Sequence, residues 1–102
     1  MKIVRVTYTT NPEYSEQNQS NIKQVMTDLG EIANPGINYS TCLASDGVTF
    51  THSAFFNSDD AEKVLFALPS FIHFQQRLKE SGLQAPPKQE ILTLVGSSKP
   101  IF

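Results

Sequence analysis

One histidine in this chain stands where it could take part in acid–base chemistry. His52 interrupts an alternating apolar run, residues 50–56, and imidazole is the side chain best suited to exchange a proton near neutral pH. Tyr8, Tyr14 and Tyr39 could direct hydroxyl groups into the same space and hold a phenol or a carbonyl group. These residue types predict a site for a small aromatic or enolic molecule, with His52 taking its proton.

The same residues also have a structural explanation, which stays open. A histidine on an apolar face is often a buried side chain satisfied by one hydroxyl or carbonyl group, and tyrosine is ordinary at the margin of a core. His73 is expected at the surface or in an interface. Cys42 has no cation nearby in the pattern, so we expect a small buried residue rather than a nucleophile.

Other classes of function find no support in the sequence. No group of His, Cys, Asp and Glu has metal-ligand spacing, and no phosphate-binding loop or nucleophile motif is present, so neither a metal nor a cofactor is expected. The 8 basic and 10 acidic residues are scattered and give a net charge of -2, which makes nucleic acid and anionic membranes poor partners.

The location expected from the sequence is the cytoplasm. The first ten residues alternate in polarity instead of forming an apolar block, and no window has the length of a membrane span, so we expect neither a signal peptide nor a membrane protein. A single cysteine excludes an internal disulfide and suits a reducing compartment.

A strand and a helix are expected in the first third of the chain. Residues 2–10 alternate, with Val4, Val6 and Tyr8 on one side. Asn11-Pro12-Glu13 then offers a capping side chain, a proline suited to the first helical position and an acid near the helix N-terminus, and Asn34-Pro35-Gly36 ends the helix. Its predicted inner face carries Tyr14, Asn18, Ile22, Val25, Met26, Leu29 and Ile32 or Ala33.

A hairpin is expected at the centre of the chain. Asp46-Gly47 is typical of a two-residue type I′ turn, which predicts the pairs Leu43 with Phe50, Thr41 with His52, Tyr39 with Ala54 and Ile37 with Phe56. These pairs share one face. Because that face is the more apolar one, we expect it beneath the helices, with the small hydroxyl-bearing residues on the opposite face.

A second helix and a last strand complete the pattern. Ser58 or Asp59 caps the helix, and Pro69 should kink or restart it near Ser70. Beyond the kink, the expected inward residues are Phe71, Ile72, Gln75 and Leu78, with Phe66, His73 and Arg77 on the far side. After a loop containing Pro86-Pro87, residues 89–96 supply the last strand.

The order of these elements predicts the fold. Strand, helix, strand, strand, helix, strand is the ferredoxin-like βαββαβ sandwich of the α+β class: a four-stranded antiparallel sheet with two helices on one face. The 102 residues fit a single domain, 1–102. Its core is small and its helix-free sheet face is partly apolar, so a homodimer that covers this face is expected.

Three local segments give the chain a resemblance to a known superfamily. These segments are Phe50-Thr51-His52, the stretch from Leu68 to Phe74 around the helix kink, and Leu94-Val95-Gly96-Ser97. The chain resembles the dimeric α/β-barrel superfamily, which includes the antibiotic-biosynthesis-monooxygenase-like and stress-responsive barrel proteins. The resemblance implies two sheets packed face to face in a homodimer, with a cavity in each protomer between its own sheet and helices.

The functional residues of the superfamily carry over only in part. His52 matches the third-strand histidine that lines the cavity in the stress-responsive branch. That branch often places two further histidines at the helix kink, where this chain has Leu68 and Phe71. The haem-degrading branch uses a tryptophan, which this chain lacks. The resemblance therefore disfavours haem degradation and a two-histidine cyclase.

Two functions stay open as hypotheses. In the first, a phenol or enol binds among Phe50, Phe56, Phe71 and Leu68, His52 takes its proton, and the anion reacts with oxygen, as in the cofactor-independent monooxygenases of the superfamily. In the second, the same dimer binds a small hydrophobic molecule without chemistry, or uses the aromatic residues only for its own stability. An open cavity with converging polar groups favours the first, and a cavity filled by the phenylalanines favours a structural role.

Overall fold

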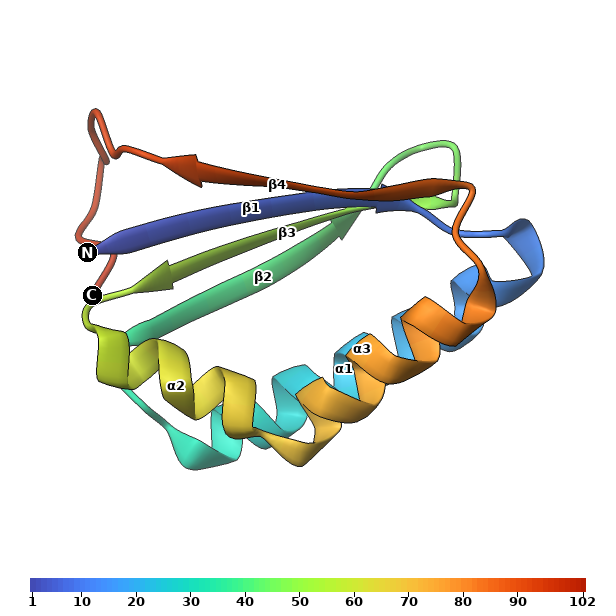
Figure 1. Cartoon of the computed structure of the whole chain (residues 1–102). Coiled ribbons are helices and arrows are strands. Elements are labelled where there is room, and N and C mark those ends of the chain that lie inside the picture. The colour runs from blue at the N-terminus through green and yellow to red at the C-terminus, as the bar shows by residue number, and fades with distance from the viewer.

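Three helices cover one face of a four-stranded antiparallel sheet, and the other face is free of helices (Figure 1). The computed structural model describes the whole chain, residues 1–102. The strands have the order β2-β3-β1-β4 and are β1 (Lys2–Thr9), β2 (Ile37–Leu43), β3 (Thr49–Phe56) and β4 (Ala85–Leu92). The helices are α1 (Ser15–Ile32), α2 (Asp59–Ala67) and α3 (Pro69–Ser81), with a short 3-10 turn, η1 (Pro12–Tyr14), before α1. The predicted α+β ferredoxin-like fold is confirmed.

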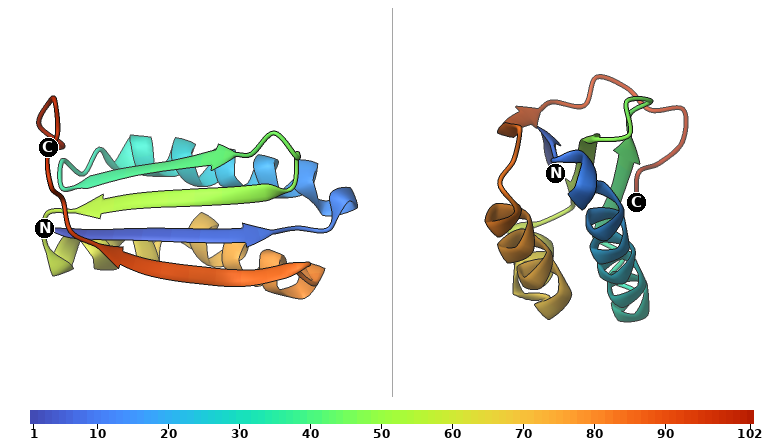
Figure 2. Two further views of the ribbon diagram at one scale, coloured as in Figure 1. Left: turned by 90° about the horizontal axis from the view of Figure 1, so that it is seen from above. Right: turned by 90° about the vertical axis from the view of Figure 1, so that its right-hand side faces the viewer.

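The helices divide the covered face between them. Figure 2 shows α1 along the β2–β3 half of the sheet and α2 with α3 along the β1–β4 half. The core between the two layers is a cluster of 12 buried residues, and Phe50, Phe56 and Val25 are its largest fully buried apolar side chains. No helix of the chain is both long and apolar enough to cross a membrane.

The register predicted for the central hairpin is confirmed. Thr41 pairs with His52, Tyr39 with Ala54, and the remaining pairs follow as expected. Along β3 burial alternates, and Phe50, His52, Ala54 and Phe56 point beneath the helices. β1 pairs with the other side of β3, so that Val6 lies opposite His52 and Tyr8 opposite Phe50.

The turn of this hairpin differs from the prediction. A type I′ turn requires positive φ at both central residues, but only Gly47 has it, with φ of 78°, and the strands are joined by the five residues 44–48. The Asp46 carboxylate instead accepts hydrogen bonds from the backbone N–H groups of Val48 and Thr49, both at 2.9 Å, and from the Thr49 hydroxyl at 2.6 Å. The side chain stabilises a longer loop, while the alternating apolar pattern fixes the register.

The last strand lies earlier in the chain than predicted. β4 runs from Ala85 to Leu92 and includes Pro86 and Pro87, which were expected in a loop, whereas residues 93–96 follow the strand. β4 is an edge strand that pairs only with β1, and an edge strand tolerates residues that cannot donate a backbone hydrogen bond. Ile91, near the end of this edge strand, is 60% exposed.

The interruption at Pro69 is confirmed, but the helical face beyond it is rotated from the prediction. Leu68 has extended backbone angles (φ -69°, ψ 121°), as expected for a residue before proline, and α3 begins at Pro69. Phe71, Phe74 and Leu78 form the buried stripe at helical spacing, whereas Ile72 is 42% exposed. Ile72 was therefore wrongly assigned to the inner face.

Two smaller expectations on burial were also wrong. Cys42 is an exposed free thiol rather than a buried residue, because alternate residues of the edge strand β2 face away from the helices. Ile32 and Ala33, the alternatives for the end of the inner face of α1, are both exposed, and the exposed fraction of Ile32 is 46%. The start of that helix also differs, because Asn11-Pro12-Glu13 initiates η1 and α1 proper begins at Ser15.

The N-cap of α2 gives a test of the local assignments. Ser58 is the cap, and its hydroxyl accepts a hydrogen bond from the Ala61 N–H at 3.1 Å. Ser58→Ala should lower the free energy of unfolding by about 1 kcal/mol, measured by urea denaturation, because the first turn loses a partner for a backbone donor. Ser20→Ala, on the exposed side of α1, is the control and should change it by less than about 0.5 kcal/mol. Equal effects of the two substitutions would remove Ser58 from the role of cap.

Candidate active site

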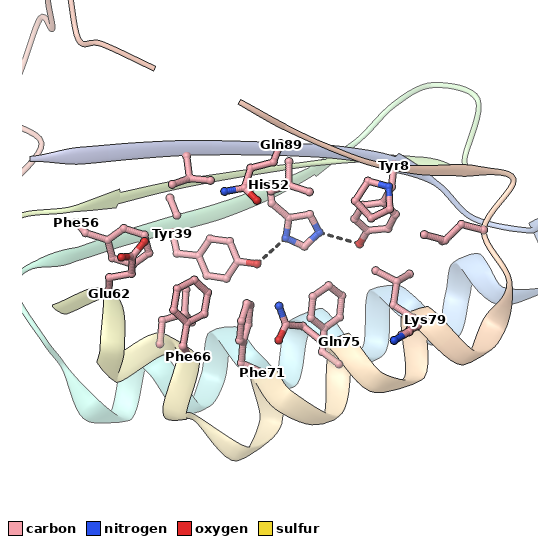
Figure 3. Close-up of a pocket in the computed structure, with 18 residues that line it drawn as sticks. Tyr8, Tyr39, His52, Phe56, Glu62, Phe66, Phe71, Gln75, Lys79 and Gln89 are labelled. Atoms are coloured by element: carbon pink, nitrogen blue, oxygen red, sulfur yellow. Dashed lines mark hydrogen bonds between the residues drawn. The ribbon is translucent and has the colours of Figure 1, made fainter. Parts of the chain in front are cut away.

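A cavity of about 510 Å³ lies between the sheet and the α2–α3 side of the helical layer (Figure 3). The 18 residues that line the cavity come mainly from all four strands and from α2 and α3. Twelve of these 18 residues are hydrophobic. The volume is within the range of small-molecule sites. The aromatic residues of the core therefore do not fill this space.

A row of three hydrogen-bonded side chains forms the sheet wall of the cavity. The Tyr8 hydroxyl lies 2.7 Å from Nε2 of His52, and the Tyr39 hydroxyl lies 2.5 Å from Nδ1 of the same ring (Figure 3). The Thr41 hydroxyl is 3.1 Å from Nδ1, and the Asn18 amide donates from Nδ2 to the Tyr8 oxygen at 2.9 Å. We call Tyr8, His52 and Tyr39 the tyrosine–histidine row.

The row is buried and carries no charge at neutral pH. His52 is 5% exposed, and burial lowers its pKa from 6.5 to about 4. Burial raises the pKa of both Tyr8 and Tyr39 above the ordinary value of tyrosine. The wall can therefore form hydrogen bonds with a ligand, but it presents no charged group to it.

Both ring nitrogens of His52 already have protein partners. A ligand that enters the cavity consequently reaches the imidazole nitrogens through a tyrosine hydroxyl, or after one hydroxyl has moved. The ring of His52 also contacts aromatic neighbours, with its centroid 5.3 Å from that of Tyr8 and 5.3 Å from that of Phe74. These contacts hold the imidazole in one orientation.

Polar side chains mark the opening of the cavity on the side of the edge strand β4. Gln89 reaches it from β4, Gln75 and Lys79 from α3, and Glu62 from α2 (Figure 3). Glu62 forms an ion pair with Lys2 at 3.0 Å. An apolar interior with a polar rim and one polar wall is the usual composition of a small-molecule site.

The structure brings together five of the eight site residues predicted from the sequence. Tyr8, Tyr39, His52, Phe56 and Phe71 line the cavity. Phe71 and Tyr39 meet edge to face, with centroids 6.2 Å apart, and so link the helical and sheet walls.

The other three predicted residues lie outside the cavity lining. Phe50 packs against Tyr8 in the core, with ring centroids 5.5 Å apart, and Leu68 is buried in the same core cluster. Tyr14 lies in η1, where its hydroxyl accepts from Asn21 Nδ2 at 3.3 Å. Phe50 and Leu68 therefore pack within the core, and Tyr14 bonds to α1, so none of the three lines the cavity.

Sequence reasoning missed several residues of the site. Phe74, Gln75, Lys79 and Gln89 line the cavity, and so does Phe66, which was expected on the far side. Phe66 is 51% exposed and lies 5.7 Å from Phe71, ring centroid to ring centroid. The sequence held two signals: Gln75 was expected on the inward side of its helix without being assigned to the site, and Asn18 is a polar residue within the apolar stripe of α1, which marks a position that needs a polar partner.

Metal ligation finds no geometric support in the folded chain. No group of three or more His, Cys, Asp and Glu side chains lies close enough together to hold a metal ion. The polar wall consists of hydroxyl, amide and imidazole groups that already bond to one another.

Comparisons with known proteins identify the fold. No protein-family model and no curated protein sequence matches the chain. Among solved structures, an antibiotic biosynthesis monooxygenase-like protein of Nitrosomonas europaea matches with a TM-score of 0.79 and 11% identity, over 94% of this chain and 100% of that one. SnoaB of Streptomyces nogalater, described as a cofactor-independent oxygenase, matches with a TM-score of 0.69 and 14% identity, over 97% and 98% of the two chains. A protein of Pseudomonas aeruginosa gives a TM-score of 0.74 and 20% identity, over 93% and 94%.

The chain thus has the ferredoxin-like fold of the antibiotic biosynthesis monooxygenase-like proteins, as the sequence resemblance implied. The match extends over nearly the whole length of both chains. At these identities the similarity establishes the fold, and the chemistry has to be argued from the site itself.

Proposed function

We propose that the protein binds a small aromatic or enolic molecule in the cavity and oxidises it as a cofactor-independent monooxygenase. The observation that carries the proposal is the buried tyrosine–histidine row on one wall of an otherwise apolar cavity of about 510 Å³. Such a wall can hold an oxygen atom of the substrate while the aromatic residues hold its ring.

The proposed reaction uses the substrate as its own source of electrons. Loss of a proton gives an electron-rich enol or phenol anion, which transfers electrons to O2, and a carbon–oxygen bond forms to give a peroxide. Protonation of the peroxide and loss of water leave a carbonyl group, so that a methylene group and one molecule of O2 become a carbonyl group and one molecule of water. All four electrons come from the substrate, and no external reductant enters the balance.

His52 is the proposed catalytic residue, acting together with Tyr39. Because the Tyr39 hydroxyl lies 2.5 Å from Nδ1, the pair can take the substrate proton when Nδ1 is free of hydrogen and can supply one to the peroxide when Nδ1 carries it. Tyr8, Phe56 and Phe71 are the proposed substrate-binding residues that line the same space. Tyr14, Phe50 and Leu68 do not line the cavity, and their proposed role is to stabilise the structure around it.

The test is oxygen consumption by the purified protein with a panel of phenols, hydroquinones and cyclic 1,3-diketones. The proposal predicts that at least one compound consumes O2 and gains one oxygen atom while losing two hydrogen atoms. With labelled O2, the new carbonyl oxygen should carry the label. A panel in which no compound binds and none consumes O2 would contradict the proposal.

A second function is favoured by one specific observation. Both nitrogens of His52 are bonded within the protein, and its pKa of about 4 makes it a weak base, which suits a binding site without chemistry. In that case the protein would bind members of the same panel, seen as shifts of Tyr39 and Phe71 signals in NMR spectra, and would consume no O2.

We also propose a homodimer that covers the helix-free face of the sheet. Leu92 lies on this face beside Ile3 and is 37% exposed, and Leu94 and Val95, which follow β4, are 38% and 102% exposed. The molar mass in solution should therefore be about twice the 11.3 kDa of the chain. Leu92→Lys should shift the protein toward the monomer in light scattering, whereas Ile72→Lys, on the helical side, should not. A mass of one chain at every concentration would exclude the dimer.

A cytoplasmic location is also part of the proposal. The only cysteine of the chain, Cys42, is an exposed free thiol, and a reducing compartment preserves such a group.

A further inference from the structure

We infer that Asn18 sets the direction of the hydrogen bonds along the tyrosine–histidine row, so that Tyr39 donates into the cavity and selects ligands with a carbonyl or enolate oxygen. This deepens the proposed function, because it names the chemical class of the group that the cavity binds. It rests on that proposal only for the use of the cavity as the ligand site.

The first step is the Asn18 amide. Asn18 lies on α1, is 0% exposed, and points its Nδ2 at the Tyr8 oxygen at 2.9 Å. An NH2 group donates and cannot accept a hydrogen bond, so the Tyr8 oxygen is the acceptor of this contact. The hydrogen of the Tyr8 hydroxyl must then find its acceptor elsewhere.

The second step fixes the tautomer of His52. Tyr8 is 2% exposed, and the other partner of its hydroxyl is Nε2 of His52, at 2.7 Å. A buried hydroxyl hydrogen left without an acceptor is costly, so Tyr8 donates to Nε2. The imidazole is neutral at pH 7, since burial lowers its pKa to about 4, and a neutral ring that accepts at Nε2 carries its hydrogen on Nδ1.

The third step turns the Tyr39 hydroxyl toward the ligand. With a hydrogen on Nδ1, the ring donates to the Tyr39 oxygen at 2.5 Å. The Tyr39 hydrogen cannot also point at Nδ1, so it faces the cavity or the neighbouring hydroxyl of Thr41, which stands 3.1 Å from Nδ1. Tyr39 lines the cavity, and a ligand oxygen with a free lone pair completes the series of bonds.

The consequence is a preference between ligands of the same shape. A carbonyl or enolate oxygen accepts the Tyr39 hydrogen, whereas a hydrocarbon of equal size leaves it without a cavity partner. Because the imidazole N–H strengthens Tyr39 as a donor, an oxygen that gains negative charge during reaction is held more strongly than a neutral one.

The tautomer is measured directly by two-bond 1H–15N correlation spectra of the 15N-labelled protein at pH 7. The chain has 2 histidines, and His73→Gln assigns the signals of His52 by difference. The expected result is a hydrogen on Nδ1 and an unprotonated Nε2. A reversed Asn18 amide would make Tyr8 donate to Asn18 and place the hydrogen on Nε2, and that spectrum in the unaltered protein would overturn the inference.

A matched pair of substitutions separates Asn18 from general effects of changing α1. Asn18→Asp replaces the donor to Tyr8 with an acceptor, so the Tyr8 hydroxyl should donate to it and the hydrogen of His52 should move to Nε2. Asn21→Asp is the control, because Asn21 lies on the same helix and also donates from Nδ2 to a tyrosine hydroxyl, that of Tyr14, at 3.3 Å. It should leave the His52 spectrum unchanged. An unchanged spectrum in folded Asn18→Asp would show that Asn18 does not set the direction.

Ligand preference is tested with 1-acetylnaphthalene and 1-isopropenylnaphthalene, which differ by exchange of the carbonyl oxygen for a methylene group. The carbonyl compound should bind about three- to tenfold more tightly, followed by naphthyl fluorescence, and Tyr39→Phe should equalise the two. Equal binding to the unaltered protein would contradict the inference. An Nδ1–H spectrum and a carbonyl preference without O2 consumption by any substrate would leave the inference standing and remove the oxygenase.

Discussion

Replacing His52 with glutamine is expected to lower the rate of oxygen consumption by roughly 10²- to 10⁴-fold, the usual contribution of a positioned acid–base group. Glutamine has a similar reach and can bond to both Tyr39 and Tyr8, but its amide cannot exchange a proton near neutral pH. The loss should therefore appear in kcat, while the affinity for the substrate changes little. The measurement is oxygen uptake at saturating substrate, together with a thermal melt that verifies folding.

The control for this variant is the other histidine. His73→Gln alters an exposed side chain on α3 that does not line the cavity, so oxygen uptake should match that of the unaltered protein. Tyr39→Phe should also slow turnover, because the pair loses the hydroxyl through which a proton reaches the substrate. A folded His52→Gln protein that turns over at the original rate would remove His52 from the mechanism and leave the cavity as a binding site.

Acidification from pH 6.5 to pH 4 is expected to lower the free energy of unfolding by about 3 kcal/mol through His52 alone. In the folded chain the pKa of His52 is about 4, because burial disfavours the charged imidazole, whereas in the unfolded chain it returns to 6.5. Between these two values the unfolded state binds more protons than the folded state, so stability falls as the pH falls. The contribution is fully present above pH 6.5 and is lost as the pH approaches 4.

Urea denaturation at several pH values between 7 and 4 measures this dependence. His52→Gln should flatten the slope over that window, since glutamine does not titrate. The Asp46 carboxylate also has a lowered pKa, because it accepts hydrogen bonds from Thr49 and Val48, but it is present in both proteins and its contribution cancels in the comparison. Parallel pH profiles of the unaltered protein and the variant would show that His52 is protonated as easily in the folded as in the unfolded chain.

The turnover experiment tests whether His52 acts in catalysis, and the denaturation experiment measures what its burial costs in stability. A buried imidazole that stays neutral lowers the stability of the folded protein at acid pH. Its place in the wall of a cavity therefore calls for a functional explanation. If turnover depends on His52, that explanation is proton exchange with the substrate through Tyr39. If turnover does not depend on His52, the same row holds a ligand oxygen, and the loss of stability at acid pH is then explained by ligand binding rather than by catalysis.

Local patterns in the sequence were sufficient for the order of the elements and for the inner face of the hairpin. The alternation from Phe50 to Phe56 has period two, so a shift by one residue would have turned every apolar side chain outward. For that reason the register of β2 and β3 was correct even though the turn at Asp46-Gly47 was not. Pro69 interrupted the helix as expected, because its effect on the preceding residue is local.

The boundaries of β4 and the rotation of α3 depended on contacts with the rest of the molecule. Leu92 and Leu94 looked alike in the sequence, but only residues that reach β1 join the sheet, and pairing with Ile3 ends at Leu92. Phe74 and Ile72 are both large and apolar. Phe74 is the one that is buried, because α3 packs it against the ring of His52.

The partners of His52 were decided by tertiary structure alone. Asn18, Tyr8 and Tyr39 arrive from α1, β1 and β2, and no periodicity within one segment relates their side chains. Sequence patterns showed that an imidazole points under the helices, because side-chain alternation in a strand is a local property. Whether that space is filled or open follows from how far α2 and α3 stand from the sheet, which is set by the packing of residues distant in the chain.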